Sequence, residues 1–145
     1  MDNKIVKFLS KHHLMTLATS SDNEPYCSSL FYAFLESHEM LVFMSQDNTK
    51  HIRDIKYNNK VAGTIAPETT IAKIQGIQLT GTIEILDGQL LALAKSSYQK
   101  KFPMSKLMDG IIYGIELNYI KMTDNTLGFG KKLIWTKETE IASIS

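Results

Sequence analysis

Over the first 45 residues, apolar positions are spaced first as in a short helix and then as in strands. In MDNKIVKFLSKHH, Ile5, Phe8 and Leu9 fall on one helical face and lysines occupy the others. The apolar runs HLMTLATS, YCSSLFYAFL and MLVFMS have strand composition and are separated by the polar turns SSDNEP and ESHE. This pattern predicts an N-terminal helix followed by a meander of three antiparallel strands.

Helical spacing returns after residue 46. In DNTKHIRDIKYNN, Asp47 or Asn48 is placed to cap a helix, and Ile52 and Ile55 form a one-sided apolar stripe. VAGTIAP then predicts a strand, IAKIQGIQLTGTIEIL a long strand, DGQLLALAKSSYQKKF a third helix and IIYGIELNYIKMTD a last strand. The third helix takes its apolar face from Leu90, Leu91, Ala94 and Tyr98.

The long strand predicted over residues 71–86 alternates with a period of two. Gln78 lies on one side, and Ile77 and Leu79 lie on the other. Gly76 and Gly81 predict bulges or sharp bends, as a barrel wall needs. Six strands and three short helices, with little strand–helix–strand alternation, indicate a mainly β fold: a six-stranded antiparallel barrel with helices on its rim. The length predicts a single domain over residues 1–145.

Composition narrows the classes of protein. The net charge of +1 provides no overall field that would attract nucleic acid or a membrane surface. The single cysteine, Cys27, excludes an internal disulfide framework and fits a reducing compartment. No apolar run reaches the roughly 18 residues of a membrane span, and the N-terminus is too polar for a signal peptide. We therefore expect a cytoplasmic protein that binds neither nucleic acid nor membranes.

The segment FMSQDNTKHIRDI is the strongest candidate for binding chemistry. A predicted strand ends at Ser45 and a predicted helix begins a few residues later, so free backbone N–H groups and a partial positive charge face the connecting turn. Ser45 and Thr49 add hydroxyl groups, Lys50 adds charge, and Arg53 lies one turn further on the same helical face. The segment is either a phosphate site or an ordinary capped surface helix.

A second candidate is the C-terminal stretch NTLGFGKKLIW. Gly128 and Gly130 allow the backbone to approach a ligand closely, and Lys131 and Lys132 supply positive charge. The stretch matches neither the P-loop pattern nor the dinucleotide fingerprint. It is either a phosphate-binding turn or a tight turn between two strands with solvated lysines.

Other chemistries find little support in the sequence. The four histidines lack zinc-ligand spacing, so we expect no metal site. Cys27 lies in a strand-like run and is predicted to be a buried, inert thiol. No Gly-x-Ser-x-Gly elbow supports a serine hydrolase. Phe31, Tyr32 and Phe34 have no accompanying basic stripe, so core packing is favoured over stacking on RNA bases.

In order along the chain, LMTLATSSDNEPYCSSLFYAF, LVFMSQDNTKHIRDIKYNNKVAGTI and IQGIQLTGTIEIL resemble the FMN-binding split-barrel superfamily, the fold of pyridoxamine 5'-phosphate oxidase. The tail TDNTLGFGKKLIW resembles its small YhbP-like branch. The resemblance covers nearly the whole chain. It implies a Greek-key split barrel that forms a homodimer, with FMN in a groove between the subunits.

The resemblance also implies roles for single residues. Those that match the phosphate contacts of the family are Ser45, Thr49 and Lys50, the cluster reached above on physical grounds. Ser28 and Ser29 match residues of the second strand that lie along the isoalloxazine ring, and Gln78 matches a polar contact near the flavin edge.

The sequence departs from the family in two places. Many relatives carry an arginine near the start of the first strand, where this chain has His13. We expect Arg53, or Lys131 and Lys132, to replace that charge and Trp135 to cover the pocket. The segment with which true pyridoxamine phosphate oxidases hold their substrate has no match here, so that specific activity is not expected.

Three functions remain open. The first is an FMN-dependent oxidoreductase of unknown substrate, with no residue that stands out as a catalytic acid or base. The second is a flavin-binding module without turnover. The third is a split barrel that holds haem or a deazaflavin, for which His12, His13 and His51 are the candidate axial ligands.

Overall fold

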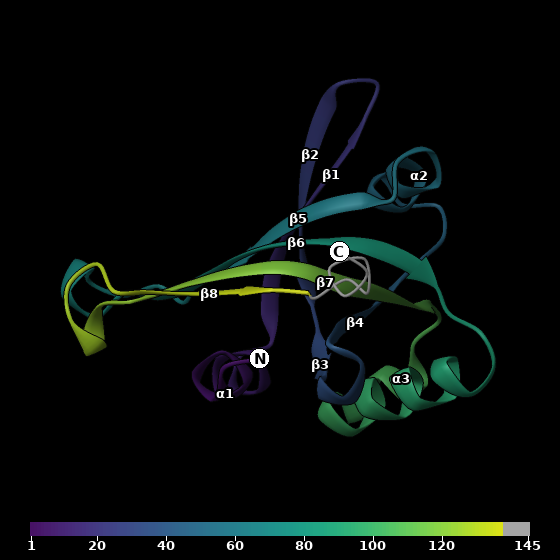
Figure 1. The fold of residues 1–145 in the computed structure, drawn as a ribbon. Helices are drawn as coiled ribbons and strands as arrows, with labels where there is room; N and C mark the ends of the chain where they lie inside the picture. The colour runs from purple at the N-terminus through teal and green to yellow at the C-terminus, as the bar shows by residue number, and fades with distance from the viewer. Residues whose placement is uncertain (138–145) are drawn as a thin grey trace, which may run out of the picture.

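The computed structural model describes residues 1–137, and within them three α-helices and eight antiparallel strands form one strongly curled sheet (Figure 1). The helices are α1 (Asn3–Lys11), α2 (Lys50–Tyr57) and α3 (Gly88–Lys101). The strands are β1 (Leu14–Ser21), β2 (Glu24–Phe31), β3 (Ala33–Leu35), β4 (Met40–Ser45), β5 (Lys60–Ile65), β6 (Gln75–Ile85), β7 (Ile111–Asp124) and β8 (Lys132–Thr136). The predicted single domain extends to residue 145, and residues 138–145 lie outside the described part.

The strand order is β2-β1-β5-β6-β7-β4-β3, and β8 pairs with the second half of β7. Because β3 continues β2 after a break at Tyr32, the two edge strands are one stretch of chain, and the sheet curls into a split barrel. The predicted mainly β, antiparallel barrel fold is confirmed. The strand count is higher than predicted because YCSSLFYAFL forms two strands and the C-terminal stretch adds β8.

Tyr32, at the break between β2 and β3, is held by two hydrogen bonds. Its backbone N–H donates to the carbonyl of His13 at 2.9 Å, and its buried hydroxyl donates to the carbonyl of Leu9 at 2.9 Å. The first bond extends the β1–β2 pairing by one residue pair beyond Leu14 and Phe31, and the second ties Tyr32 to the last turn of α1.

One of the two predicted bulges is present. The register between β6 and β7 shifts between Thr80 and Gly81, opposite the extra residue Asn118. A Cβ atom at Gly81 would lie only 2.6 Å from the carbonyl oxygen of Glu116, so this close approach requires glycine. The prediction of a bulge at Gly76 is wrong, because the pairing is regular there.

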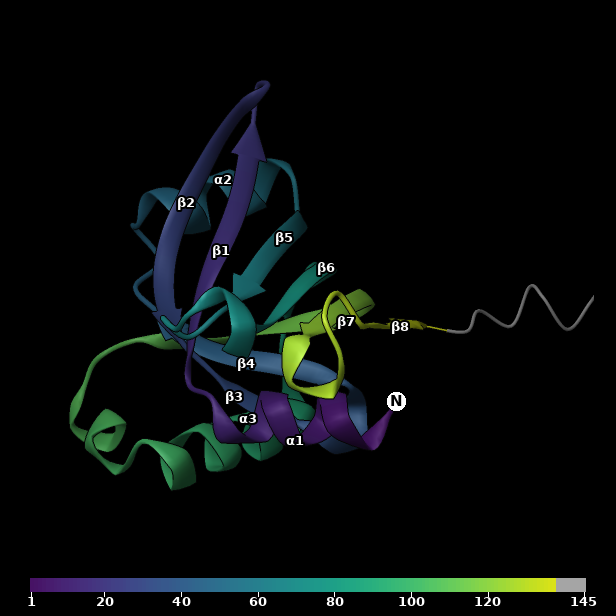
Figure 2. The same ribbon diagram turned by 90° about the vertical axis from the view of Figure 1, so that its left-hand side faces the viewer.

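The barrel interior holds the main core. α1 contributes Ile5 and Leu9 to it, and α2 contributes Ile52 and Ile55. In Figure 2, α1 lies near the bottom of the sheet and α2 lies beside the β1–β2 hairpin at the top. A second cluster, formed under α3, is separate from the first and consists of Ala33, Leu35, Met40, Val42, Leu86, Ala94, Tyr98 and Ile112.

The Gly-Phe-Gly stretch is a tight turn between β7 and β8. Gly128 and Gly130 have φ angles of 137° and 75°, which L side chains rarely adopt, and the N–H of Gly130 donates to the Asn125 side chain at 2.9 Å. The stretch is therefore a turn between two strands, and the phosphate-binding role of its lysines stays a prediction.

Candidate functional site

A compact polar cluster lies where β4 meets α2. The Oγ atom of Ser45, the last residue of β4, lies 2.8 Å from Nε2 of His51 and 3.2 Å from Oγ1 of Thr49. Thr49 Oγ1 lies 3.2 Å from the same His51 nitrogen. The predicted pair of Ser45 and Thr49 is thus brought together. His51, considered in the sequence only as a haem ligand, is a third member, and its placement depends on how α2 docks on the barrel.

The start of α2 differs from the predicted one. Thr49, and not Asp47 or Asn48, occupies the N-cap position. Its hydroxyl donates to the carbonyl of Gln46 at 3.2 Å and makes no capping hydrogen bond to the helix. The helix begins directly behind this hydroxyl, so its first N–H groups lie close to the Ser45 cluster.

The His51 ring is held in its neutral form. Burial lowers the pKa of His51 below its ordinary value of 6.5, although the nearby Asp54 carboxylate acts in the opposite direction. A neutral imidazole has one N–H, so the ring either donates to or accepts from the Ser45 and Thr49 hydroxyls. The cluster is therefore uncharged near neutral pH and supplies hydrogen bonds rather than charge.

The predicted cation, Lys50, is paired within its own helix. Its Nζ donates to Oδ1 of Asp54 at 3.0 Å and lies 5.1 Å from the centre of the Tyr26 ring. The other carboxylate oxygen of Asp54 accepts from Thr19 Oγ1 at 2.9 Å. The hydrogen bonds from Lys50 and Thr19 lower the pKa of Asp54. Arg53 is exposed beside this pair, and because Asp47 precedes the helix, the segment 47–54 has two basic and two acidic side chains and no net charge.

The serines of β2 lie on opposite faces of the sheet. Ser28 pairs with Leu17 and faces inward, and its buried Oγ has no hydrogen-bond partner among residues 1–137. Ser29 pairs with Thr16 and is exposed on the outer side. A planar ring lying on one face of the sheet therefore reaches only one of these two side chains.

The outer side of the sheet is an open face of small and polar residues. One row of paired residues crosses it from β2 to β8: Ser29, Thr16, Thr64, Gln78, Lys121 and Ile134. Gln78 is exposed at the centre of this row. Cys27 alternates with Ser28 and is also exposed on this face, so the prediction of a buried thiol is wrong. Phe31, predicted as core, is half exposed for the same reason.

The residues of the C-terminal stretch lie far from α2 in the same chain. Figure 1 shows the β7–β8 turn at one end of the molecule and α2 at the other. Lys131 and Lys132 are exposed at that turn, whereas Trp135 is partly buried and packs against the barrel core. Within one chain, these three residues are not brought to Ser45. Their predicted roles at the phosphate and over the pocket stay predictions that require a second subunit.

The remaining histidines differ in access. His12 packs on the Phe8 ring with 4.3 Å between ring centres, and His13 is exposed and stacked on Phe31 at 6.1 Å. Within residues 1–137, no three His, Cys, Asp or Glu side chains are grouped to hold a metal ion. In the same part of the chain, no helix has the length and apolar character of a membrane span.

Comparison with known proteins extends these observations. The family model for pyridoxamine 5'-phosphate oxidase matches residues 1–112. A UPF0306 protein of Serratia proteamaculans is 40% identical over 135 residues, which cover 92% of this chain and 94% of that protein.

Solved structures share the fold at low identity. A heme binding protein from Mycobacterium smegmatis matches with a TM-score of 0.74 at 20% identity, over 86% of this chain and 52% of that one, so this chain spans about half of its length. An FAD-binding protein from Mesorhizobium loti matches with a TM-score of 0.67 at 15% identity, over 83% and 92% of the two chains. These likenesses support the split-barrel fold, and the sequence matches show that the chain belongs to the pyridoxamine 5'-phosphate oxidase family and to its UPF0306 relatives.

Proposed function

We propose that this chain binds FMN as a homodimer and acts as an FMN-dependent oxidoreductase. The observation that carries the proposal is the junction of β4 and α2. There the Ser45 and Thr49 hydroxyls and the Lys50 ammonium group lie within one turn of a helix N-terminus. Hydroxyl, ammonium and helix N–H groups are the donors that bind a phosphate group well.

The donor set fits a phosphate, with one shortfall in charge. A phosphate monoester carries about −1.5 to −2 charges near neutral pH, whereas the charges of Lys50 and Arg53 are balanced by those of Asp47 and Asp54. In this proposal Lys131 and Lys132 of a second subunit supply the additional charge, and both are exposed at the β7–β8 turn.

The open face suits the flavin ring. Its central residues, Thr16 and Thr64, have small side chains, so a planar ring can lie close to the sheet. Ser29 and Gln78 border this area and offer a hydroxyl and an amide to the polar edge of the ring. Ser28 faces the other side of the strand with its Oγ unpartnered within residues 1–137, and its predicted place along the ring stays a prediction.

A homodimer accounts for the apolar residues of the same face. Leu14, Phe31 and Ile134 are 49%, 52% and 64% exposed there. Such residues gathered on one face favour a protein interface, and a two-fold dimer would cover this face on both subunits at once. The interface would also exclude water from a bound flavin.

The chemistry follows from this arrangement. The flavin would supply the electron or hydride transfer. The residues of two subunits bind and orient it: Lys50 and Thr49 of one subunit hold the phosphate, Gln78 and Ser29 on the open face of the other donate hydrogen bonds at the ring, and the dimer interface keeps out water. No side chain of the open face is assigned a proton transfer, so we propose a nicotinamide or another small organic donor as the partner in the reaction.

Haem binding is the second candidate, and one observation favours it. His13 is an exposed imidazole stacked on the half-exposed Phe31, so it is free to ligate iron beside an apolar surface. His51 is a poorer ligand, because its Nε2 contacts two hydroxyls. A Soret band on adding haemin, lost in His13→Ala, would favour haem, whereas flavin absorbance with no such band favours FMN.

The direct test is a flavin titration of dialysed protein. In a fluorescence-quenching titration, Lys50→Ala is expected to weaken FMN binding by about tenfold, the lower range for one charge-assisted hydrogen bond. Lys95→Ala, an exposed lysine on α3, is the matched control and leaves affinity unchanged. Equal affinities in all three proteins would refute the phosphate site. Bleaching of the bound flavin by NADH or NADPH then distinguishes an enzyme from a binding module.

A further inference from the structure

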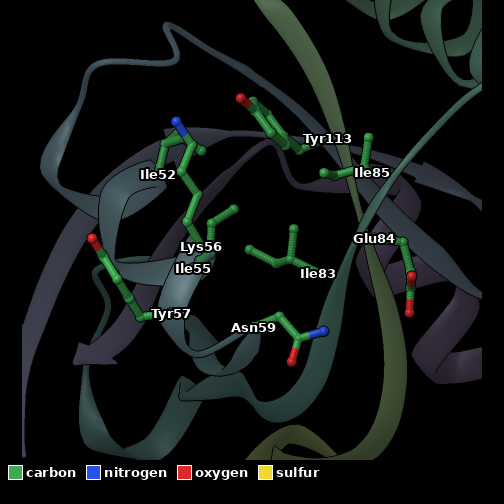
Figure 3. Close-up of a pocket in the computed structure, with 9 residues that line it drawn as sticks. All are labelled: Ile52, Ile55, Lys56, Tyr57, Asn59, Ile83, Glu84, Ile85 and Tyr113. Atoms are coloured by element: carbon green, nitrogen blue, oxygen red, sulfur yellow. The ribbon is translucent and has the colours of Figure 1, made fainter. Parts of the chain in front are cut away.

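A cavity of about 550 Å³ lies between α2 and the ends of β6 and β7 (Figure 3). This volume is within the roughly 300–1,000 Å³ typical of small-molecule sites. The cavity is bordered by α2 from Ile52 to Tyr57 and has no lining residue in common with the Ser45 cluster. Its lining residues are Ile52, Ile55, Lys56, Tyr57, Asn59, Ile83, Glu84, Ile85 and Tyr113.

The floor of the cavity is apolar and rigid. Ile52, Ile55 and Ile83 belong to the barrel core and are almost fully buried. The N–H of Ile83 donates to the carbonyl of Asn59 at 2.9 Å, which fixes the exit of α2 against β6. The cavity is therefore a preformed part of the fold, with one wall from a helix and the other from two strands.

Two large side chains at the rim of the cavity are exposed to solvent. Tyr57, on the α2 side, is 85% exposed, and Ile85, on the β6 side, is 87% exposed. Figure 3 shows them on opposite sides of the cavity. Neither contributes much to the core, so a bound apolar molecule between them would remove a large apolar area from water.

The polar groups are unevenly placed. In Figure 3, the Lys56 ammonium group and the Tyr113 hydroxyl lie at the same end of the cavity, and the Glu84 carboxylate points away from its centre. Within residues 1–137, Lys56 makes no ion pair and the Tyr113 hydroxyl makes no hydrogen bond. Burial and the Asp47 charge raise the pKa of Tyr113, so its hydroxyl keeps its proton near neutral pH.

The Tyr113 ring is held in place by neighbouring aromatic rings. Its ring stacks on Phe43 with 5.6 Å between centres and 23° between planes, and Phe43 packs against the His51 ring. A cation and a phenol O–H thus stand at one end of the cavity, with Asp47 near the phenol, and the other polar lining residues are Asn59 and Glu84. This arrangement is complementary to a molecule with one carboxylate and an apolar body.

We propose that this cavity binds a small monocarboxylic acid with an aromatic or branched apolar body. The carboxylate accepts from Lys56 and Tyr113, and the body lies on Ile55 and Ile83 between Tyr57 and Ile85. Glu84 turns away from the site and disfavours a second acidic group on the ligand. The inference does not depend on flavin binding, because it involves none of the residues proposed to hold FMN.

The test uses 2-naphthoate and its neutral analogue 2-naphthamide with the full chain. Binding is followed by calorimetry and by the backbone amide shifts of residues 52–59 and 83–85. We expect naphthoate to bind about tenfold more tightly than the amide, as one charge-assisted contact predicts. Lys56→Met, which keeps the apolar stem of this exposed side chain, should abolish the difference, and Lys95→Met should preserve it.

Three outcomes would overturn the proposal. One is equal binding, or no binding, of the acid and the amide to the wild-type protein. The second is a preference for the acid that survives in Lys56→Met. The third is displacement of naphthoate by FMN in direct competition, which would place the acid in the flavin site. Tighter acid binding that is lost in Lys56→Met, with shifts confined to the cavity, supports it.

Discussion

The substitution Gly81→Ala tests how the barrel wall is built. A Cβ atom at this position would lie 2.6 Å from the carbonyl oxygen of Glu116 and 2.6 Å from Cγ2 of Ile115. The isoleucine side chain can rotate, but the carbonyl belongs to the paired strand and moves only with the backbone. Overpacking of this kind typically costs 1–3 kcal/mol, and contact with backbone argues for about 3 kcal/mol.

The loss of folding stability should appear as a lower melting temperature (Tm). At this chain length, each 1 kcal/mol lowers Tm by about 2–4 °C, so Gly81→Ala should melt roughly 6–12 °C below the wild type in a circular-dichroism scan. Gly76→Ala, on the same strand, is the control, because its Cβ would lie 3.5 Å from Ala66 and from the carbonyl of Ile65, an ordinary contact. It should unfold within about 2 °C of the wild type. Equal melting of the two variants would refute the register assigned to β6 and β7.

Three further predictions concern the site. Asp54→Asn releases Lys50 and removes a negative charge, so FMN should bind about fivefold more tightly in a fluorescence titration, and weaker binding would contradict the assigned pairing. Burial lowers the pKa of His51 in the folded protein. The neutral side chain therefore contributes its full stability to the fold above the unfolded-state pKa of 6.5, and this contribution is lost as pH falls below that pKa. Urea midpoints at pH 7 and pH 5 should therefore differ less in His51→Gln than in the wild type. Phe31→Glu places a charge on the open face. Light scattering should give a single-subunit mass for this variant and twice that mass for the wild type. An equal mass for both proteins would argue against this interface.

Much of the fold could be predicted from the spacing of apolar residues. The alternation around Gln78 located the long strand, and the stripe of Ile52 and Ile55 located α2, because both patterns record which side of an element faces the core. The break at Tyr32 could not be predicted. The buried position of the Tyr32 side chain depends on its hydrogen bond to the carbonyl of Leu9, which comes into reach only after α1 docks on the barrel.

The candidate site was predicted in part. Ser45 and Thr49 were expected together from a strand end and a helix start, and they lie 3.2 Å apart. Lys50 and Asp54 are four residues apart, a spacing that favours an ion pair on one helical face. This pair lowers the positive charge that a ligand meets. The exposure of Cys27 was not predictable from composition, because an aromatic-rich strand can turn either side to the core.

The central claim is that the β4–α2 junction binds the phosphate of FMN. Riboflavin lacks this phosphate and keeps the same ring, so the ratio of the two dissociation constants measures the contribution of the junction. With at least two charge-assisted hydrogen bonds of about 1.5 kcal/mol each, FMN should bind more than about 100-fold more tightly than riboflavin to the wild type. This ratio should fall in Lys50→Ala, with riboflavin affinity unchanged. Equal affinities of FMN and riboflavin for the wild-type protein would contradict the account.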